Sequence, residues 1–185
     1  MDEETIFKKS VNYIHKKLNI ILKNIPHSVI SEACSLFFEA NRVFVYGAGR
    51  SGLVAKAFAI RLVHLGFQTF VIGETIGAPV KKGDLVVIVS GSGETIPAVM
   101  TSEIAHNIGA TVLVITGSSK SRITKYATIC ICLEPDDNDE KKKLAPLGTL
   151  FEASAWVLLD GLIAELMDRK GETERSMQLR HATLE

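Results

Sequence analysis

Two glycine-rich segments of the chain combine small residues with hydroxyl groups, as phosphate-binding loops do. The first runs from Gly47 to Gly52 and reads GAGRSG, and the second runs from Ser90 to Thr95 and reads SGSGET. Glycines allow tight turns that present backbone N–H groups, serines and threonines add donors, and a following helix N-terminus favours negative charge. A phosphate group is therefore the ligand that these segments are suited to hold.

The two segments occupy equivalent places in a repeated unit. Each follows an apolar, β-branched run and precedes a helical pattern, and the same offset along the chain separates Gly47 from Gly91 and Ser51 from Thr95. Loops at the carboxyl ends of neighbouring parallel strands meet in one crevice. The spacing therefore predicts one site for one phosphorylated small molecule. The hydroxyl groups also have a simpler interpretation, which is N-capping of the two helices.

The first segment also has the spelling G-x-G-x-x-G of dinucleotide-binding proteins, and Glu74 follows the next strand at about the distance of a ribose-binding acid. Glu74 comes after Gly73 rather than at the strand end, however. Arg50 and Ser51 also place a cation and a hydroxyl where such loops keep small residues. An oxidoreductase with a nicotinamide or flavin cofactor is the less favoured alternative.

Strands and helices alternate along the chain, which predicts an α/β fold with five parallel strands and helices on both faces of the sheet. The expected strands are 42–46, 67–72, 85–89, 111–115 and 128–133, and the expected helices between them are 53–65, 96–108 and a short one at 121–126. We treat residues 1–185 as one domain with five parts. These are N-terminal helices (1–40), an α/β core (41–133), a linker (134–148), a C-terminal helix (149–170) and a polar tail (171–185).

The two terminal helices carry more apolar surface than a small domain buries, which predicts a homo-oligomer, either a dimer or a tetramer. The first has one apolar stripe that includes Phe7 and Val11, and the last is apolar nearly all round, with Trp156 among its residues. A core helix between layers is the alternative for the last. The tail is expected to be disordered unless a neighbour or a ligand holds it.

Composition excludes several classes of function. The 21 basic and 21 acidic residues balance, so neither nucleic acid nor an anionic membrane is an expected partner. Met1–Glu4 does not resemble the start of a signal peptide, and three cysteines are few for a secreted protein, so we expect a cytoplasmic location. Cys34, Cys130 and Cys132 are expected to be buried thiols rather than metal ligands.

Together these segments resemble the sugar isomerase domain and, within it, the 6-phospho-3-hexuloisomerase family. The matching stretches are 44–52, 61–67, 73–75, 90–93 and 146–152, which come in the same order and span most of the chain. The resemblance implies a flavodoxin-like or Rossmann-like three-layer fold and an enzyme that interconverts 3-hexulose 6-phosphate and fructose 6-phosphate through a cis-enediol. It also implies a dimer or tetramer of the ribulose monophosphate pathway, used in formaldehyde fixation, that needs no cofactor or metal.

The resemblance also implies site residues. Substrate binding is expected to fall to the two glycine-rich segments, through Gly49, Arg50, Ser51, Ser90, Gly91, Ser92, Gly93, Glu94 and Thr95. Glu152 is implied as the catalytic base, although Thr149 and Glu152 also have the spacing of a capping box, in which the carboxylate would bond back to the helix start. Some family members carry a basic residue at the position of Glu94, so its role stays open.

His181 resembles the C-terminal histidine that related isomerases bring into the pocket as an acid, from the same or another subunit. Without that resemblance it is a histidine in a polar tail. His64 is expected to be a packed histidine or a partner of a helix C-terminus. The same pocket also serves non-catalytic regulators, but no helix-turn-helix or basic arm accompanies it in this chain, which favours the enzyme.

Overall fold

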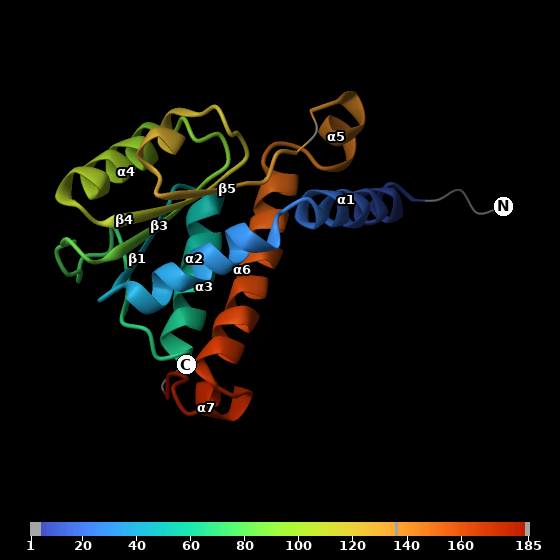
Figure 1. Cartoon of the computed structure of the whole chain (residues 1–185). Coiled ribbons are helices and arrows are strands. Elements are labelled where there is room, and N and C mark those ends of the chain that lie inside the picture. Colours follow the sequence, from blue (N-terminus) through green and yellow to red (C-terminus); the bar gives the residue numbers. More distant parts are fainter. Residues whose placement is uncertain (1–4, 136, 184–185) are drawn as a thin grey trace.

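The computed structural model describes residues 5–135 and 137–183. Met1–Glu4, which bore on the expected location, Asp136 of the expected linker, and Leu184 and Glu185 of the expected tail lie outside the described residues. Five parallel strands form one sheet in the order β2-β1-β3-β4-β5 (Figure 1). Their bounds are Val43–Gly47 (β1), Thr69–Val71 (β2), Leu85–Ser90 (β3), Thr111–Thr116 (β4) and Ile129–Cys132 (β5).

Helices cover both faces of this sheet, which confirms the predicted fold class. One face packs against α3 and α6, with α2 beside α6, and the other packs against α4 and the short 3-10 helix η1. The helices are α1 (Ile6–Lys23), α2 (His27–Glu39), α3 (Arg50–His64), α4 (Ile96–Ile108), η1 (Arg122–Tyr126), α5 (Asp139–Leu144), α6 (Thr149–Lys170) and α7 (Glu174–Gln178). None of them, within the part of the chain described, is both long and apolar enough to cross a membrane.

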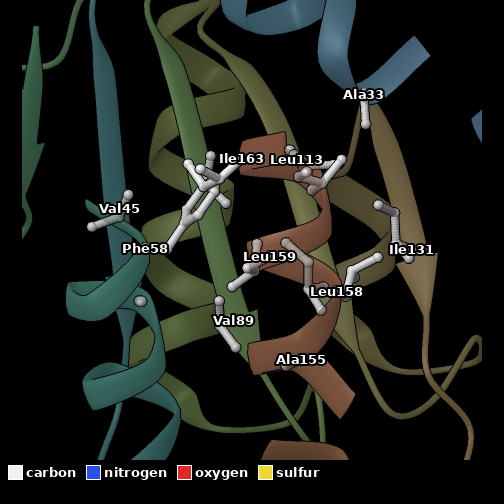
Figure 2. Packing of buried hydrophobic residues seen from close by; sticks show 14 of the residues in the cluster. Ala33, Val45, Phe58, Val89, Leu113, Ile131, Ala155, Leu158, Leu159 and Ile163 are labelled. Atoms are coloured by element: carbon white, nitrogen blue, oxygen red, sulfur yellow. The ribbon is translucent and has the colours of Figure 1, made fainter. Parts of the chain in front are cut away.

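The core sits on both sides of β3, whose six residues are all buried. Alternate side chains of a strand point to opposite faces, so Val87 and Val89 pack toward α3 and α6 while Val86 and Ile88 pack toward α4. A strand with two apolar faces belongs in the middle of a parallel sheet. Figure 2 shows Leu158, Leu159 and Ile163 of α6 lying over Val89 and Leu113 of the sheet.

Two segments differ from the sequence-based expectation. The linker contains α5, which begins because the Asn138 side chain accepts a hydrogen bond of 2.8 Å from the Lys141 N–H. The tail was expected to be disordered without a neighbour or ligand, and that was wrong. It forms α7, which starts with a capping box between Thr173 and Ser176, and it folds back against α3 of its own chain.

Candidate active site

The sheet brings the two glycine-rich segments side by side, because β1 and β3 are neighbours and the strand order reverses between them. Gly47, at the end of β1, lies opposite Val89 of β3. Helix α3 begins at Arg50 and α4 begins at Ile96, so two helix N-termini follow the two loops. The predicted crevice therefore has two sets of backbone N–H donors at one edge of the sheet.

The hydroxyl groups of these loops do not cap the helices. The N-cap residues are Gly49, which has a φ of 59°, and Thr95, and neither α3 nor α4 has a side-chain cap hydrogen bond. Ser92 is exposed, and its Oγ accepts from the Glu94 N–H at 3.2 Å and lies 3.4 Å from Oγ1 of Thr95. The N-capping interpretation is therefore not supported. The hydroxyls of Ser92 and Thr95 lie close together at the start of α4.

Ser90 differs from the other predicted phosphate ligands because its hydroxyl is buried. Its Oγ has no hydrogen-bond partner among the described residues, and the same holds for Thr116 Oγ1, in the residue paired with it on β4. Ser90 is 4% exposed. It lies beneath the loop rather than on its surface, so a direct contact with a ligand stays a prediction for this residue.

Close packing explains the glycines of the first loop. A Cβ on Gly47 would lie 2.7 Å from the Ser51 carbonyl oxygen, and a Cβ on Gly52 would lie 2.6 Å from the Gly47 carbonyl oxygen. Both distances are shorter than van der Waals contact, so the strand and the first turn of α3 approach each other as only glycine allows. This packing fixes where the N-terminus of α3 points.

Glu152 lies on the first turn of α6, and its Oε2 accepts a charge-assisted hydrogen bond from Nε of Arg50 on α3. The Glu152 side chain is only 13% exposed, whereas that of Arg50 is 72% exposed. The capping box expected as the alternative does not form. Gly148 is the N-cap, while the N–H and the Oγ1 of Thr149 donate to the Pro146 carbonyl at 3.3 and 2.6 Å.

A cavity of about 310 Å³ opens beside this ion pair. Its walls come from the N-terminal parts of α3 and α6 and include Leu53 and Trp156, which are 64% and 47% exposed. The carboxylate of Glu152 is thus a hydrogen-bond acceptor and candidate base at the edge of a mostly apolar cavity, next to the first glycine-rich loop. The volume suits a small phosphorylated molecule.

Two supporting residues escaped the sequence analysis. A Cβ on Gly148 would lie 2.9 Å from Glu152 Oε1, so the carboxylate in its present position packs directly against this glycine. The ring of Phe151, which is 3% exposed, packs so closely on the second loop that a Cβ on Gly91 would lie 3.0 Å from it. Both residues fall within the run PLGTLFE that carried the family resemblance, and that run was the available signal.

Glu94, for which substrate binding stays a prediction, is held by the neighbouring residue Arg122. Its carboxylate accepts from the Arg122 N–H and from Arg122 Nε, both at 2.7 Å. The backbone hydrogen bond and the side-chain hydrogen bond from Arg122 lower the pKa of Glu94. Glu74, the residue considered for ribose binding, pairs with Lys56 on α3 at 2.6 Å. Both carboxylates have structural partners in this arrangement.

His181 does not lie with the other predicted site residues. It stacks on His64 with ring centroids 4.9 Å apart, and His64 is the last residue of α3. Arg50 is the first residue of the same 15-residue helix, so the two ends are roughly 20 Å apart at 1.5 Å per residue. His64 is 4% exposed, which matches the packed histidine expected for it.

Comparisons with known proteins agree with this architecture. The SIS domain family matches residues 36–153. An uncharacterized protein of Archaeoglobus fulgidus is 39% identical over 93% of this chain and 96% of its own length. The 3-hexulose-6-phosphate isomerase of Bacillus subtilis is 35% identical over 96% of this chain and all of its own length.

A solved structure extends the comparison to three dimensions. The hypothetical protein of Methanococcus jannaschii, for which a molecular function of 3-hexulose-6-phosphate isomerase was inferred, has a TM-score of 0.87 to this chain. It is 30% identical and covers 96% of this chain and 99% of its own. The family match spans more than half of the sequence, and both relatives match this chain over nearly its whole length. This chain therefore belongs to the SIS domain family.

Proposed function

We propose that the protein is a phosphosugar isomerase that interconverts 3-hexulose 6-phosphate and fructose 6-phosphate. The observation that carries the proposal is the Arg50–Glu152 pair, which sets a mostly buried carboxylate beside a phosphate loop and a cavity of about 310 Å³. The names of relatives that match over nearly the whole chain support the choice of substrate. No cofactor or metal takes part in the reaction as we propose it.

The phosphate is anchored by the two loops. Backbone N–H groups near Gly49 and Gly93, with the hydroxyls of Ser51, Ser92 and Thr95, surround the N-termini of α3 and α4. Helix N-termini stabilise a dianion, and the anchor holds the sugar carbons in a fixed position relative to Glu152. In this proposal the guanidinium of Arg50 orients the Glu152 carboxylate and adds positive charge near the substrate.

The reaction moves a carbonyl from C3 to C2 of the sugar. Glu152 removes the proton from C2 while the C3 oxygen takes up a proton, which gives a cis-enediol between the two carbons. The C2 hydroxyl then loses its proton as Glu152 returns one to C3, and the products are fructose 6-phosphate and the original carboxylate. All atoms balance without a further reactant.

We also propose that the protein is a homo-oligomer, because large apolar side chains of α1 and α6 remain exposed to solvent. Phe7 of α1 is 72% exposed, and Trp156 and Val157 of α6 are each 47% exposed. In an assembly, His181 of one subunit is the proposed acid for the site of another, since it does not reach Glu152 of its own chain. Sedimentation at micromolar concentration tests the assembly, and a monomer would contradict it.

An assay in heavy water tests the reaction. Fructose 6-phosphate incubated with the protein should exchange the hydrogen at C3 with solvent deuterium and yield 3-hexulose 6-phosphate, as nuclear magnetic resonance detects. A non-catalytic sugar-phosphate sensor with the same pocket would bind fructose 6-phosphate and protect the protein against thermal unfolding, yet exchange no hydrogen. Binding without exchange would therefore replace the isomerase with the sensor.

A further inference from the structure

The second glycine-rich loop is bound along one side by the segment between β4 and β5. The Gly117 N–H donates to the Gly91 carbonyl at 2.9 Å, and the Ile123 N–H donates to the Gly93 carbonyl at 3.1 Å. The C=O and the N–H of a trans peptide unit point in opposite directions, so each bond turns the N–H of the following loop residue away from this segment. Because β4 and β1 lie on opposite sides of β3, these N–H groups are directed toward the side of β1 and the first loop.

Arg122, the first residue of η1, binds the same loop with three donor groups. Its N–H and its Nε donate to the two carboxylate oxygens of Glu94, both at 2.7 Å, and its Nη2 donates to the Glu94 carbonyl at 3.1 Å. The bond to the carbonyl turns the Thr95 N–H away from η1 in the same manner, and Thr95 is the N-cap of α4. Arg122 thus fixes the peptide unit at which the N-terminus of α4 begins.

Glu94 places a negative charge beside the N-terminus of α4. Hydrogen bonds from the Arg122 backbone and side chain lower the pKa of Glu94, so its carboxylate is ionised at neutral pH. An unpaired carboxylate at this position would repel the dianion that the helix N-terminus attracts. The guanidinium of Arg122 offsets that charge. The side chains of Arg122 and Glu94 are 52% and 50% exposed, so water screens the pair and the effect of its charge on a ligand is modest.

We propose that Arg122 is a positioning residue of the phosphate site and that it acts through Glu94. It directs the N–H groups at the start of α4 toward the phosphate, and it cancels the charge of the carboxylate beside them. In this role Arg122 does not touch the ligand. The inference rests on the proposed function in one respect, which is that the second loop binds the phosphate of the substrate. It adds that the affinity of this loop depends on a residue outside both glycine-rich segments.

Calorimetric titration with inorganic phosphate at low ionic strength tests the proposal. Arg122→Gln should weaken phosphate binding about fivefold, the upper range for a half-exposed charge pair. In a Glu94→Gln background the same substitution should weaken binding less than about twofold, because the carboxylate that Arg122 holds is gone. Lys125, on the same 3-10 helix, also lowers the pKa of Glu94 through its charge, but within the described residues it forms no hydrogen bond to the loop. The control Lys125→Gln should therefore keep phosphate binding within about twofold of wild type.

The exchange assay with fructose 6-phosphate separates positioning from a loss of structure. Arg122→Gln should raise KM about fivefold and keep kcat within about twofold of wild type, as expected when only uniform binding is lost. Unchanged phosphate affinity in Arg122→Gln would overturn the proposal, and so would an equal loss in Lys125→Gln, because general charge would then be responsible. An equal loss with and without the Glu94 carboxylate would also overturn it, since Arg122 would then act on the phosphate directly. Wild-type protein that binds phosphate but exchanges no hydrogen would contradict the isomerase and not this inference, which the binding comparison decides.

Discussion

The two ends of α3 are built from similar parts but differ in what they leave accessible. At the N-terminal end Arg50 pairs with Glu152, and the pair borders an open cavity. At the C-terminal end Arg180 donates to the His64 carbonyl at 3.0 Å and to Glu172, and His181 covers the ring of His64. The first arrangement orients a carboxylate toward space, whereas the second closes the helix end with the chain's own tail.

Helix polarity explains the difference. The N-terminus of α3 has unpaired N–H groups that suit an anionic ligand, so an open end there can bind one. The C-terminus has carbonyl groups without a partner in the helix, and the guanidinium of Arg180 satisfies one of them, that of His64. One helix can therefore serve a ligand at one end and anchor the tail at the other.

The largest expected effect is at the open end. Glu152→Gln keeps the shape of the side chain but cannot accept a proton as a carboxylate does. The rate at which the hydrogen at C3 of fructose 6-phosphate exchanges with solvent should fall at least about a hundredfold, which is the low end for loss of a general base. The matched control is Glu165→Gln, later on the same helix and outside the cavity, which should retain normal turnover. Retention of a tenth of wild-type turnover by Glu152→Gln would remove this residue from the mechanism.

The next prediction compares a glycine of the second loop with a glycine at the C-terminal end of α6. Gly93, in the second loop, has a φ of 64°, and a Cβ there would lie 2.1 Å from Ser121 Oγ. Gly171, at the end of α6, has a φ of 66° but open space around it. Gly93→Ala should cost about 3 kcal/mol in unfolding free energy, from strain and overpacking, and Gly171→Ala only about 1 kcal/mol. Urea unfolding measures both, and equal losses would mean that the second loop yields to an added methyl group.

The closed end should open at low pH. Hydrogen bonds from Arg180 and then from Ser176 lower the pKa of Glu172 from 4.5 to about 2. A depressed pKa means that the contribution to stability is complete above 4.5 and is lost as the pH falls toward 2. Amide exchange of Met177 in α7 should accelerate over that window. Arg180→Gln should give the same acceleration already at neutral pH, while Arg175→Gln should not.

The smallest effect concerns the turn that leads into α6. Among the residues that the structure describes, Leu147 is the non-glycine residue with a positive φ, 56°, and it is 89% exposed. Leu147→Asn should stabilise the protein by about 0.5 kcal/mol, since asparagine tolerates this conformation better and little burial is lost. Leu179→Asn changes an equally exposed leucine of ordinary φ and should give no gain in thermal unfolding experiments.

The sequence predicted the surroundings of the N-terminal end of α3 better than those of its C-terminal end. The expected strand at 85–89 and helix at 96–108 match β3 and α4, because buried strands and a helix ended by Gly109 have strong local signals. The two loops were found for the same reason. The adjacency of β1 and β3 followed from the known preference for ligand sites at a switch in strand order.

The missed features depend on contacts between distant parts of the chain. Nothing near Arg180 in the sequence indicates that it reaches His64, and the spacing of Thr149 and Glu152 indicated a capping box that the partner from α3 replaces. Such pairs form because the helices pack together, and no local pattern encodes them. The tail was expected to be disordered for that reason, and its capping box has Ser176 rather than a glutamate or glutamine at the third position, so the usual signature is missing.

The position of α6 at the end of the chain has a consequence for protein synthesis. The five strands and both loops are complete once Cys132 has left the ribosome, but the sheet face with Val89 and Leu113 is covered only when α6 follows. Until then the nascent chain displays a broad apolar surface, of the kind that chaperones bind and that promotes aggregation. The helix that carries Glu152 is thus also the element whose packing protects the newly synthesised chain from aggregation.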